Sequence, residues 1–530
     1  MSNLDSSEED PSSSKALSVD ECIQRAGGFG RFQWVLMLWA GLARQGVSFY
    51  FYTLAYSELV PKLECKDLTL QTFEPCEVED ICNGSDIIDR DLWRVDYTDS
   101  KSFHNWMTDL ELYCHSDFMI GLFGSMLFLG FALSGIGLKQ SDRFGRKNTI
   151  LGGILISLIS VFILFFWRNL YAKYVGLLIL GFIGFKNLAI YILTVESVPM
   201  QYQIYVTGWI LSSDPLFTLI PATIFLMAGG KQLQHFFIVG CVVAVLSFFL
   251  VLLVPESPKF LFEKKRYSEL RKNLAYMAKF NGVSMGEYQI EGETPPSGFR
   301  ENSEENGQTE QKLYRVDLIN RSDLTSESQI EAIENIENRP LLEKETRKDF
   351  SVRQELKNKR TLMNLICVIV IFCVGSFNYY MVGFYIKYVG DNIYINILAS
   401  TSSEIAGNFA FAFIQKCIGS KKSLIVCFML SLASAIPLLF VNNSIVIAIC
   451  VFSGKFFIEG GFTVAYFVNP EIFHPLFVPF SFGLCNFVAR IFTIFAPQVA
   501  EIKPRQTPVI VLMVLAFLAT FLTTFMRKKK

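Results

Sequence analysis

The sequence predicts an all-α membrane protein whose twelve transmembrane helices form two six-helix bundles. Of its 530 residues, 51% are hydrophobic, and the mean hydropathy is +0.36. A helix that crosses a membrane needs about 20 mostly apolar residues, and twelve stretches of the chain approach that length. They fall six and six around a long polar segment, as expected of two repeats that face each other across a substrate path.

The first six predicted spans lie at residues 32–52, 118–138, 149–166, 171–193, 206–227 and 236–254. The other six lie at residues 362–385, 393–413, 424–439, 444–466, 480–499 and 509–525. Two connections, 53–117 and 255–360, are much longer than the rest. The chain therefore divides into a cytoplasmic tail (1–31), an N-terminal bundle (32–254) with an outer loop (53–117), a cytoplasmic central segment (255–360), a C-terminal bundle (361–526) and a basic tail (527–530).

The loop between the second and third spans is short and carries several charges. It contains Asp142, Arg143, Gly145, Arg146 and Lys147. The glycine gives a tight loop the backbone freedom that it needs, and the cations favour a cytoplasmic loop that resists translocation. On these residues alone, the loop is either an ordinary positively charged cytoplasmic loop or a functional loop of a transporter.

Lysine and arginine residues gather on one side of the predicted membrane. The clusters at 139–147, 416–422 and 527–530 share a side if both termini are cytoplasmic. Four cations fall on the opposite side, namely Arg168, Lys173, Lys503 and Arg505. In this topology the glycosylation sequons at Asn83 and Asn442 face outward. We expect a plasma-membrane protein with both termini inside, and an internal membrane stays open as the alternative.

Four of the 12 cysteines, Cys65, Cys76, Cys82 and Cys114, lie in the first long loop. In an outward-facing loop they predict two disulfides, for which three pairings are possible. A zinc site is the competing interpretation. It is disfavoured because the loop has no CxxC pair, and its two histidines, His104 and His115, are irregularly spaced.

The central segment divides into two parts. Prolines at 255 and 258 end the sixth span, and residues 260–280 read as a basic amphipathic helix suited to the inner membrane surface. Residues 282–347 are acidic and poor in aromatics, which predicts a disordered linker that could bind regulatory partners. Residues 1–20 are polar and acidic, and they predict a disordered cytoplasmic tail without a signal peptide.

Several motifs together resemble the organic cation, anion and carnitine transporter family of the major facilitator superfamily. They are the glycine-rich residues 27–33, the cysteine-bearing outer loop, the 142–147 loop, Glu196 after the fourth span, Glu256 within Pro-Glu-Ser-Pro, and Glu471 within residues 470–473. The resemblance implies a major facilitator fold that works by alternating access. It also implies gating roles for Asp142, Arg143, Gly145, Arg146, Lys147, Glu196, Glu256 and Glu471.

Two loops depart from the pattern of that family. Residues 201–205 and 474–479 lack the arginines that the family places after its fourth and tenth spans. These arginines pair with carboxylates to latch one state of the transport cycle. Their loss predicts altered gating, and a non-transporting structural or sensing relative remains an alternative.

Charged residues at membrane depth are the candidate binding groups, because each costs at least about 2.5–3.5 kcal/mol at the bilayer centre unless it faces a cavity or a partner. They are Arg44, Lys186, Asp214, Glu404, Lys455, Glu459 and Arg490. A structural ion pair is the alternative for each of them. For Lys186 and Lys455 we favour the structural alternative, because long amines can brace helices.

The resemblance makes Arg490 the most informative of these residues. The family places Asp here in its cation-handling branch and Arg in its anion-handling branch, and a guanidinium can hold a carboxylate through two hydrogen bonds. Glu404 takes the place of the family's acidic residue and could balance Arg490 in an empty site. The predicted substrate-binding residues are Arg44, Tyr50, Asp214, Tyr379, Glu404 and Arg490.

The predicted function is transport of a small organic ion, with an anion or zwitterion favoured over a cation. A sugar porter is a further alternative, disfavoured by the large cysteine-bearing loop and by the missing Pro-Glu-Thr-type motif after the last span. No HExxH, nucleophile elbow or phosphate loop indicates an enzyme. We therefore expect no enzymatic activity, no cofactor, no metal and no nucleic-acid partner; the expected partners are the solute and the lipid bilayer.

Overall fold

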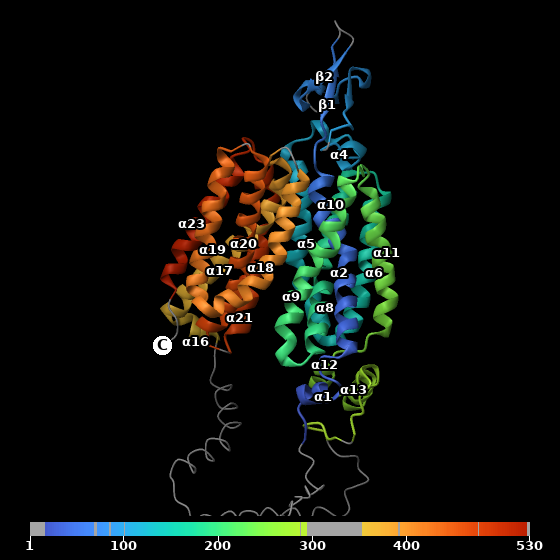
Figure 1. Cartoon of the computed structure of the whole chain (residues 1–530), viewed down its shortest axis with the longest axis vertical. Coiled ribbons are helices and arrows are strands. Elements are labelled where there is room, and N and C mark those ends of the chain that lie inside the picture. The colour runs from blue at the N-terminus through green and yellow to red at the C-terminus, as the bar shows by residue number, and fades with distance from the viewer. Residues whose placement is uncertain are drawn as a thin grey trace, which may run out of the picture.

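The computed structural model describes residues 16–67, 72–83, 86–99, 101–286, 288–293, 352–390, 393–441, 443–474 and 476–526. Two helical bundles stand side by side, with small strands at one end and short helices at the other (Figure 1). We call these ends the strand end and the α13 end. The tail 1–15, most of the acidic linker (294–351), Asn442 and the basic tail (527–530) lie outside the described residues.

The N-terminal bundle follows the predicted order of spans. It contains α2 (Arg31–Ser57), α5 (Asp117–Phe144), α6 (Arg146–Phe166), α7 (Leu170–Phe182), α8 (Gly184–Glu196), α9 (Gln203–Asp214), α10 (Ile220–Met227) and α11 (Gln234–Leu253). The fourth span is divided into α7 and α8 at Ile183. The fifth is divided by a π-helical turn, η4 (Pro215–Leu219), which begins at a proline that has no backbone N–H to donate.

The C-terminal bundle repeats this plan. It contains α17 (Lys359–Tyr385), α18 (Ile393–Ile418), α19 (Ser420–Ala435), α20 (Ser444–Ile472), α21 (Val478–Thr493), α22 (Ala496–Glu501) and α23 (Thr507–Phe525). Within the described residues, 11 helical stretches are long and apolar enough to cross a membrane. The helix α2, with 27 residues, is a further long helix and is not among those 11. The predicted helical membrane fold is confirmed for the two bundles, and the described part of the first long loop adds short strands.

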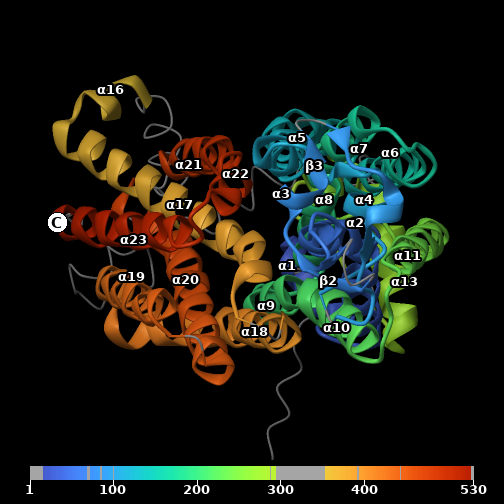
Figure 2. The ribbon, with the colours of Figure 1, turned by 90° about the horizontal axis from the view of Figure 1, so that it is seen from above.

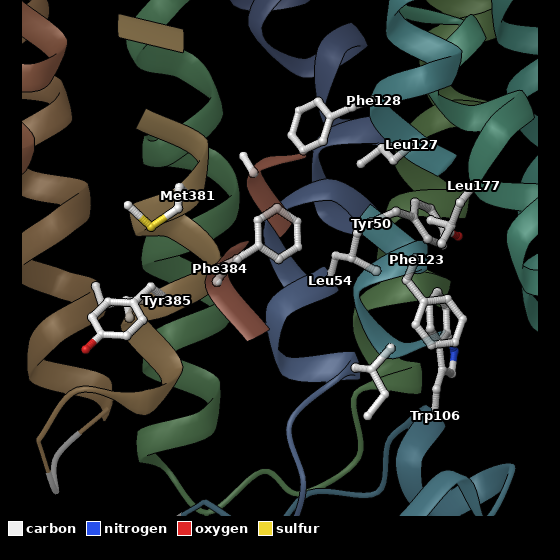
Figure 3. Close-up of a cluster of buried hydrophobic side chains, with 14 of the residues drawn as sticks. Tyr50, Leu54, Trp106, Phe123, Leu127, Phe128, Leu177, Met381, Phe384 and Tyr385 are labelled. Atoms are coloured by element: carbon white, nitrogen blue, oxygen red, sulfur yellow. The ribbon is translucent and has the colours of Figure 1, made fainter. Parts of the chain in front are cut away.

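The two bundles meet along α5, α9 and α10 of the first and α18, α21 and α22 of the second, as the view from above shows (Figure 2). A buried apolar cluster continues across the contact, from Leu54 and Phe128 to Met381 and Phe384 (Figure 3). Because this core is shared, the strand-end parts of the two bundles are held together by packing as well as by polar contacts.

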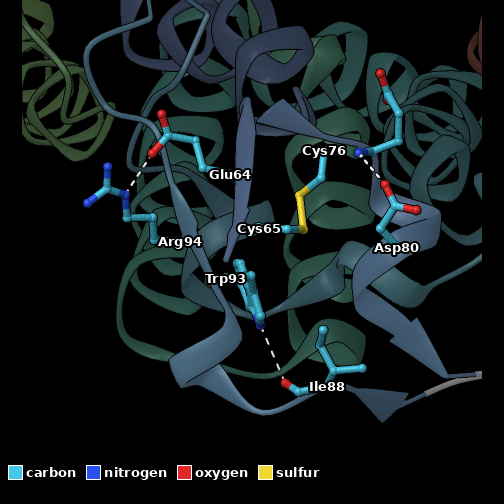
Figure 4. Close-up of a disulfide and its surroundings, with 8 residues drawn as sticks. Glu64, Cys65, Cys76, Asp80, Ile88, Trp93 and Arg94 are labelled. Carbon is cyan, nitrogen blue, oxygen red and sulfur yellow. Dashed lines mark hydrogen bonds and ion pairs between the residues drawn. A yellow bond between two sulfur atoms is a disulfide. The ribbon is translucent and has the colours of Figure 1, made fainter. Parts of the chain in front are cut away.

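The strand end is built on a three-stranded antiparallel sheet in the order β2 (Phe73–Cys76), β1 (Leu63–Lys66) and β5 (Trp93–Val95). Of the three pairings left open by the sequence, the structure contains Cys65–Cys76 and Cys82–Cys114. The first joins β1 to β2, beside the buried Trp93 (Figure 4). Strands β3 (Cys82–Asn83) and β4 (Asp86–Ile87) and the helices α3 (Val78–Ile81) and α4 (Trp106–Asp109) complete this end.

The α13 end bears on two predictions. Buried apolar side chains of α13 (Tyr267–Asn281) belong to one cluster with those of α1 (Val19–Arg25) and α12 (Pro258–Glu263), so this face of the predicted amphipathic helix has protein partners. Helix α1 also begins inside the segment predicted to be disordered, and Ser18 caps its N-terminus. Hydrophobic periodicity identifies an apolar face but not its partner, which here lies about 250 residues away in the sequence. A short helix, α16 (Val352–Lys357), precedes α17.

Candidate functional site

A cavity of about 70 Å³ lies between the two bundles. Helix α2 contributes Tyr52 and its neighbours, whereas α17, α18 and α20 contribute Tyr379, Glu404 and Lys455. Both halves therefore supply side chains to one cavity rich in aromatic residues, as a solute path between two repeats requires.

Glu404 is the centre of the polar groups in this cavity. It is only 4% exposed, and it accepts hydrogen bonds from the hydroxyls of Tyr379 and Tyr52, the latter at 3.4 Å from the opposite half. Lys455 donates to the Tyr379 carbonyl at 3.4 Å, and its Nζ lies 3.8 Å from the centroid of that ring. Glu459 is buried on the same helix as Lys455. Lys455 thus lies in the cavity wall and at the same time links α20 to α17.

Arg44 and Asp214 form an ion pair within the N-terminal bundle, with side chains 13% and 11% exposed. The Nε of Arg44 lies 3.3 Å from Oδ1 of Asp214, and the guanidinium also contacts Oδ2. Ser48 donates to the same carboxylate at 2.9 Å. This carboxylate is therefore already bound by several donors of its own half. Lys186, also buried, donates to the Ala43 carbonyl at 3.1 Å.

Arg490 is exposed and lies on α21, with its guanidinium carbon 5.9 Å from the ring of Phe131 in the opposite bundle. Tyr380, which lines the cavity, is close enough to interact electrostatically with both Arg490 and Glu404. Within the described part of the chain, Arg490 has no ion-pair partner. Among the described residues the hydroxyls of Tyr379 and Tyr52 bind Glu404, and no ion pair joins Glu404 to Arg490. The expected balance between these two residues stays a prediction.

Tyr50 lies elsewhere. Its ring stacks on Phe237 with centroids 4.8 Å apart, and its hydroxyl donates to the Phe237 carbonyl at 2.8 Å. With 2% exposure it belongs to the core of the N-terminal bundle, so we leave it out of the proposed site. The neighbouring Tyr52 is the α2 tyrosine that faces the cavity.

The predicted gating loop forms a compact cluster at the α13 end. Arg146 reaches Asp142 at 2.7 Å and Glu196 at 3.3 Å. Ser257 donates to Glu196 at 2.5 Å, which links the cluster to the start of α12. The structure thus brings Asp142, Arg146 and Glu196 together within one half.

Glu256 belongs to the same cluster and lies at the N-terminus of α6. It accepts backbone hydrogen bonds from Arg146 at 3.0 Å and from Lys147 at 3.2 Å. Burial raises the pKa of this carboxyl group, although the backbone donors oppose the shift. Gly145 has φ +99°, and a Cβ placed there would lie 2.3 Å from Glu256 Oε2, so no other residue fits easily. The guanidinium carbon of Arg143 lies 5.3 Å from the ring centroid of Phe144.

In the C-terminal half, Glu471 accepts a hydrogen bond from the hydroxyl of Ser420. The adjacent Lys421 donates to the carbonyls of Thr524 and Met526 at 2.8 and 2.7 Å. The contacts that Arg146 makes with Asp142 and Glu196, and the bond from Ser420 to Glu471, thus each lie within one half at the α13 end.

The strand end holds polar contacts between the halves that sequence reasoning missed. Lys387, in the turn η5 (Ile386–Tyr388), lies 2.8 Å from Glu501 and 3.4 Å from Glu58, and the three side chains are 0–3% exposed. Glu58 follows α2, so this buried triad joins the two bundles. Gln498 of α22 adds a bond to the Phe118 carbonyl of α5 at 3.2 Å. The two glutamates were missed because they flank the predicted spans and read as ordinary loop charges.

Residues 100–497 match the family model described as Major Facilitator Superfamily. The organic cation transporter-like protein of Drosophila melanogaster is 21% identical over 516 residues, covering 91% of this chain and 84% of that protein. Solute carrier family 22 member 2 of Mus musculus is 28% identical over 182 residues, which are 34% of this chain and 32% of that protein.

A shorter match involves the synaptic vesicle 2-related protein of Xenopus laevis, at 28% identity over 116 residues. It covers 22% of this chain and about a fifth (21%) of that protein. Among solved structures, the xylose transporter XylE from E. coli, in a partially occluded inward open conformation, matches with a TM-score of 0.51. That match has 13% identity and covers 93% of this chain and 98% of that one.

The family match spans most of both bundles, and the likeness to the xylose transporter gives the same fold. The chain therefore belongs to the major facilitator superfamily, a family of multi-pass membrane transporters and not of enzymes, with distant homology to organic cation transporter-like and solute carrier family 22 proteins.

Proposed function

We propose that this protein carries a small organic anion or zwitterion across a membrane by alternating access. The observation that carries the proposal is Arg490, an exposed guanidinium at the contact between the halves without an ion-pair partner among the described residues. A carboxylate or sulfonate of the solute supplies that partner through paired hydrogen bonds. Arg44 is a weaker anchor because Asp214 already holds it.

The groups that line the cavity suit the other end of a zwitterion. Tyr52, Tyr379 and Tyr380 present aromatic faces, and Glu404 supplies a carboxylate. Two lysines also line the cavity, Lys387, which is paired with Glu501, and Lys455. Aromatic faces attract cationic groups. A solute with an acid group at Arg490 and an amine near Glu404 satisfies both regions, whereas a simple organic cation leaves Arg490 unpaired.

The gating assignment rests on where the halves touch. The buried Lys387 triad and Gln498 close the strand end, whereas Arg146 and Glu471 bond within their own halves at the α13 end. Alternating access then requires the strand-end contacts to break and contacts between the halves to form at the α13 end. We assign the strand end to the outside of the plasma membrane, supported by its two disulfides and by the exposed Asn83.

The test is uptake into liposomes that contain the purified full chain. Labelled organic zwitterion, anion and cation are compared in the wild type, Arg490→Asp and Arg490→Lys. Because a hydrogen bond to a charged group contributes about 1.5–3 kcal/mol, Arg490→Asp should raise the KM for the anion about tenfold or more and improve relative cation uptake. The KM of Arg490→Lys for the anion should lie between the values of the wild type and of Arg490→Asp.

The matched control is Arg266→Gln, which removes an exposed arginine that pairs with Glu269 at the α13 end. It should leave uptake unchanged. An unchanged charge preference in Arg490→Asp would refute the anion-binding role. The arginine-poor loops at 201–205 and 474–479 favour one alternative, a non-transporting relative. Absence of saturable uptake of all three solutes and of hexose by folded protein would support it.

A further inference from the structure

A second cavity, of about 270 Å³, lies at the strand end within the N-terminal bundle. It is enclosed by α4, the end of α6, the start of α7 and the start of α11. It shares no lining residue with the cavity between the halves. The transport cycle proposed above makes no use of it.

The walls of this cavity are apolar and aromatic on one side. Trp106, Leu164 and Phe237 are each at most 5% exposed, and Phe165 and Phe166 at the end of α6 continue the wall. A pocket that combines an apolar wall with a few polar groups has the usual chemistry of a small-molecule site.

The charged groups of the lining are cationic on balance. Lys173 is 4% exposed, its Nζ donates to the Leu164 carbonyl, and it lies 5.5 Å from the Trp106 ring. Arg168 is exposed at the rim. Within the described ranges neither cation has an ion-pair partner. Asp109 is the one carboxylate in the lining, and it accepts from Gln234 at 3.3 Å.

Lys173 is the strongest sign of a ligand. An ammonium has three N–H donors, and burial of a positive charge is costly unless it is paired and hydrogen-bonded. Asp109 of the same lining is close enough to attract Lys173, but among the described residues it forms no ion pair with it. The Leu164 carbonyl satisfies one donor. An anionic group in the cavity would accept from the others and neutralise the charge.

The rim of the cavity lies at the level expected for the edge of a membrane. Phe166, Trp167 and Tyr171 are 63%, 56% and 69% exposed at the ends of α6 and α7. Exposed aromatic residues at helix ends form the belts that meet the lipid head groups. A ligand with an apolar part can therefore reach the cavity from this interface.

We propose that this cavity binds an amphipathic anion, that is, a carboxylate or phosphate group attached to an apolar chain or ring. The acid group lies against Lys173 and Arg168, and the apolar part lies along Trp106, Phe165 and Phe237. The same chemistry is found in a free fatty acid and in an anionic lipid of the outer leaflet, and the experiment distinguishes these two sources.

The test uses Trp106 as a reporter in the purified full chain. Brominated decanoate in solution, and brominated phosphatidate in nanodiscs, quench tryptophan fluorescence at close contact. Saturable quenching by the first assigns the site to soluble acids, and quenching by the second alone assigns it to lipid. Trp106→Phe identifies the part of the signal that comes from this cavity.

Lys173→Met, which keeps a similar side-chain volume without the charge, should weaken binding at least tenfold, and Lys173→Arg should retain most of the binding. Lys503→Met, which removes an exposed lysine paired with Glu79 at the same end, is the matched control and should bind as the wild type does. Should Lys173→Met fail to fold, Arg168→Gln at the exposed rim gives the same comparison. Equal binding by the folded lysine variant, equal quenching by brominated decanol, or no saturable quenching by either probe would overturn the proposal.

Discussion

Replacing Lys387 by methionine should release the strand end of the transporter. In the closed arrangement the ammonium of Lys387 lies 2.8 Å from Glu501 and 3.4 Å from Glu58, with no exposed surface on the lysine side chain. Methionine fills a similar volume but leaves the two carboxyl groups buried without this cation. Opening of the strand end exposes these carboxyl groups to water, so the substitution destabilises the closed state more than the open one.

The magnitude follows from the burial of the triad. Removal of one partner from a buried ion pair costs about 3–5 kcal/mol. Arg505, 4.0 Å from Glu501 and 34% exposed, compensates in part, so we take the lower limit of about 3 kcal/mol. At about 1.4 kcal/mol per factor of ten, the ratio of open to closed strand ends should rise about a hundredfold.

Ala55, which lines the cavity between the halves from α2, provides the site for an assay. In an Ala55→Cys background, Lys387→Met should raise the rate of labelling by a membrane-impermeant maleimide added at the strand end by at least tenfold. Glu501→Gln in the same chain should restore slow labelling, because it removes the uncompensated charge. The control is Lys503→Met, since Lys503 also bridges the halves through Glu79 but with 57% and 73% exposed side chains. Equal labelling rates in the Lys387 and Lys503 variants would refute the reasoning.

Three further outcomes are expected. Burial raises the pKa of Glu58, which follows α2, to about 8, whereas a hydrated glutamate has a pKa of about 4.3. The closed strand end therefore holds a proton that the open one releases, so a rise in pH from about 5 to 8 favours opening. Because maleimide reacts with the thiolate, labelling of Ala55→Cys rises with pH in any variant, and it should rise more steeply with Glu58 present than in Glu58→Gln. Gly181→Ala should prevent correct packing of α7 on α5, because its Cβ would lie 1.9 Å from the Leu127 carbonyl oxygen. Gly152→Ala should be tolerated, because a Cβ at that position has no neighbouring atom within 4 Å. Monodispersity of the purified variants on size exclusion distinguishes the two outcomes. Asn281→Ala removes hydrogen bonds to the Phe32 N–H and the Ala26 carbonyl, each at 2.8 Å, and should speed proteolysis between α1 and α2. The control is Asn273→Ala, which loses one hydrogen bond to the Glu256 carbonyl at 2.9 Å and should be cleaved more slowly.

The fold was predictable from the sequence because long apolar stretches have few alternatives to membrane-spanning helices. The site was only partly predictable. Arg490 and Glu404 could be named because charge at membrane depth is expensive, but their partners depend on how helices rotate. Successive residues turn by about 100° around a helix, so Tyr50 and Tyr52 point to nearly opposite sides of α2. One packs in the core and the other reaches Glu404.

The partners that link distant segments could not be predicted. Nothing in the local sequence relates Glu58 to Lys387, which is 329 residues further along the chain. The apolar face of α13 was predicted, but periodicity does not distinguish a lipid surface from a neighbouring helix such as α1. Contacts of this kind follow from the packed arrangement of the whole bundle.

The contact of Asn281 with the start of α2 also sets an order of events during synthesis. The backbone N–H of Phe32 donates to Asn281, which is translated 249 residues later. This hydrogen bond can therefore form only after all the helices of the first bundle have been synthesised. Domains generally fold as units during translation, the N-terminal one first. The first bundle can therefore complete its closure at about the time that Asn281 leaves the ribosome, before α17 has been synthesised. A chain stopped between Glu293 and α17 would contain every residue that this closure needs, and the second bundle would then assemble against a finished first one.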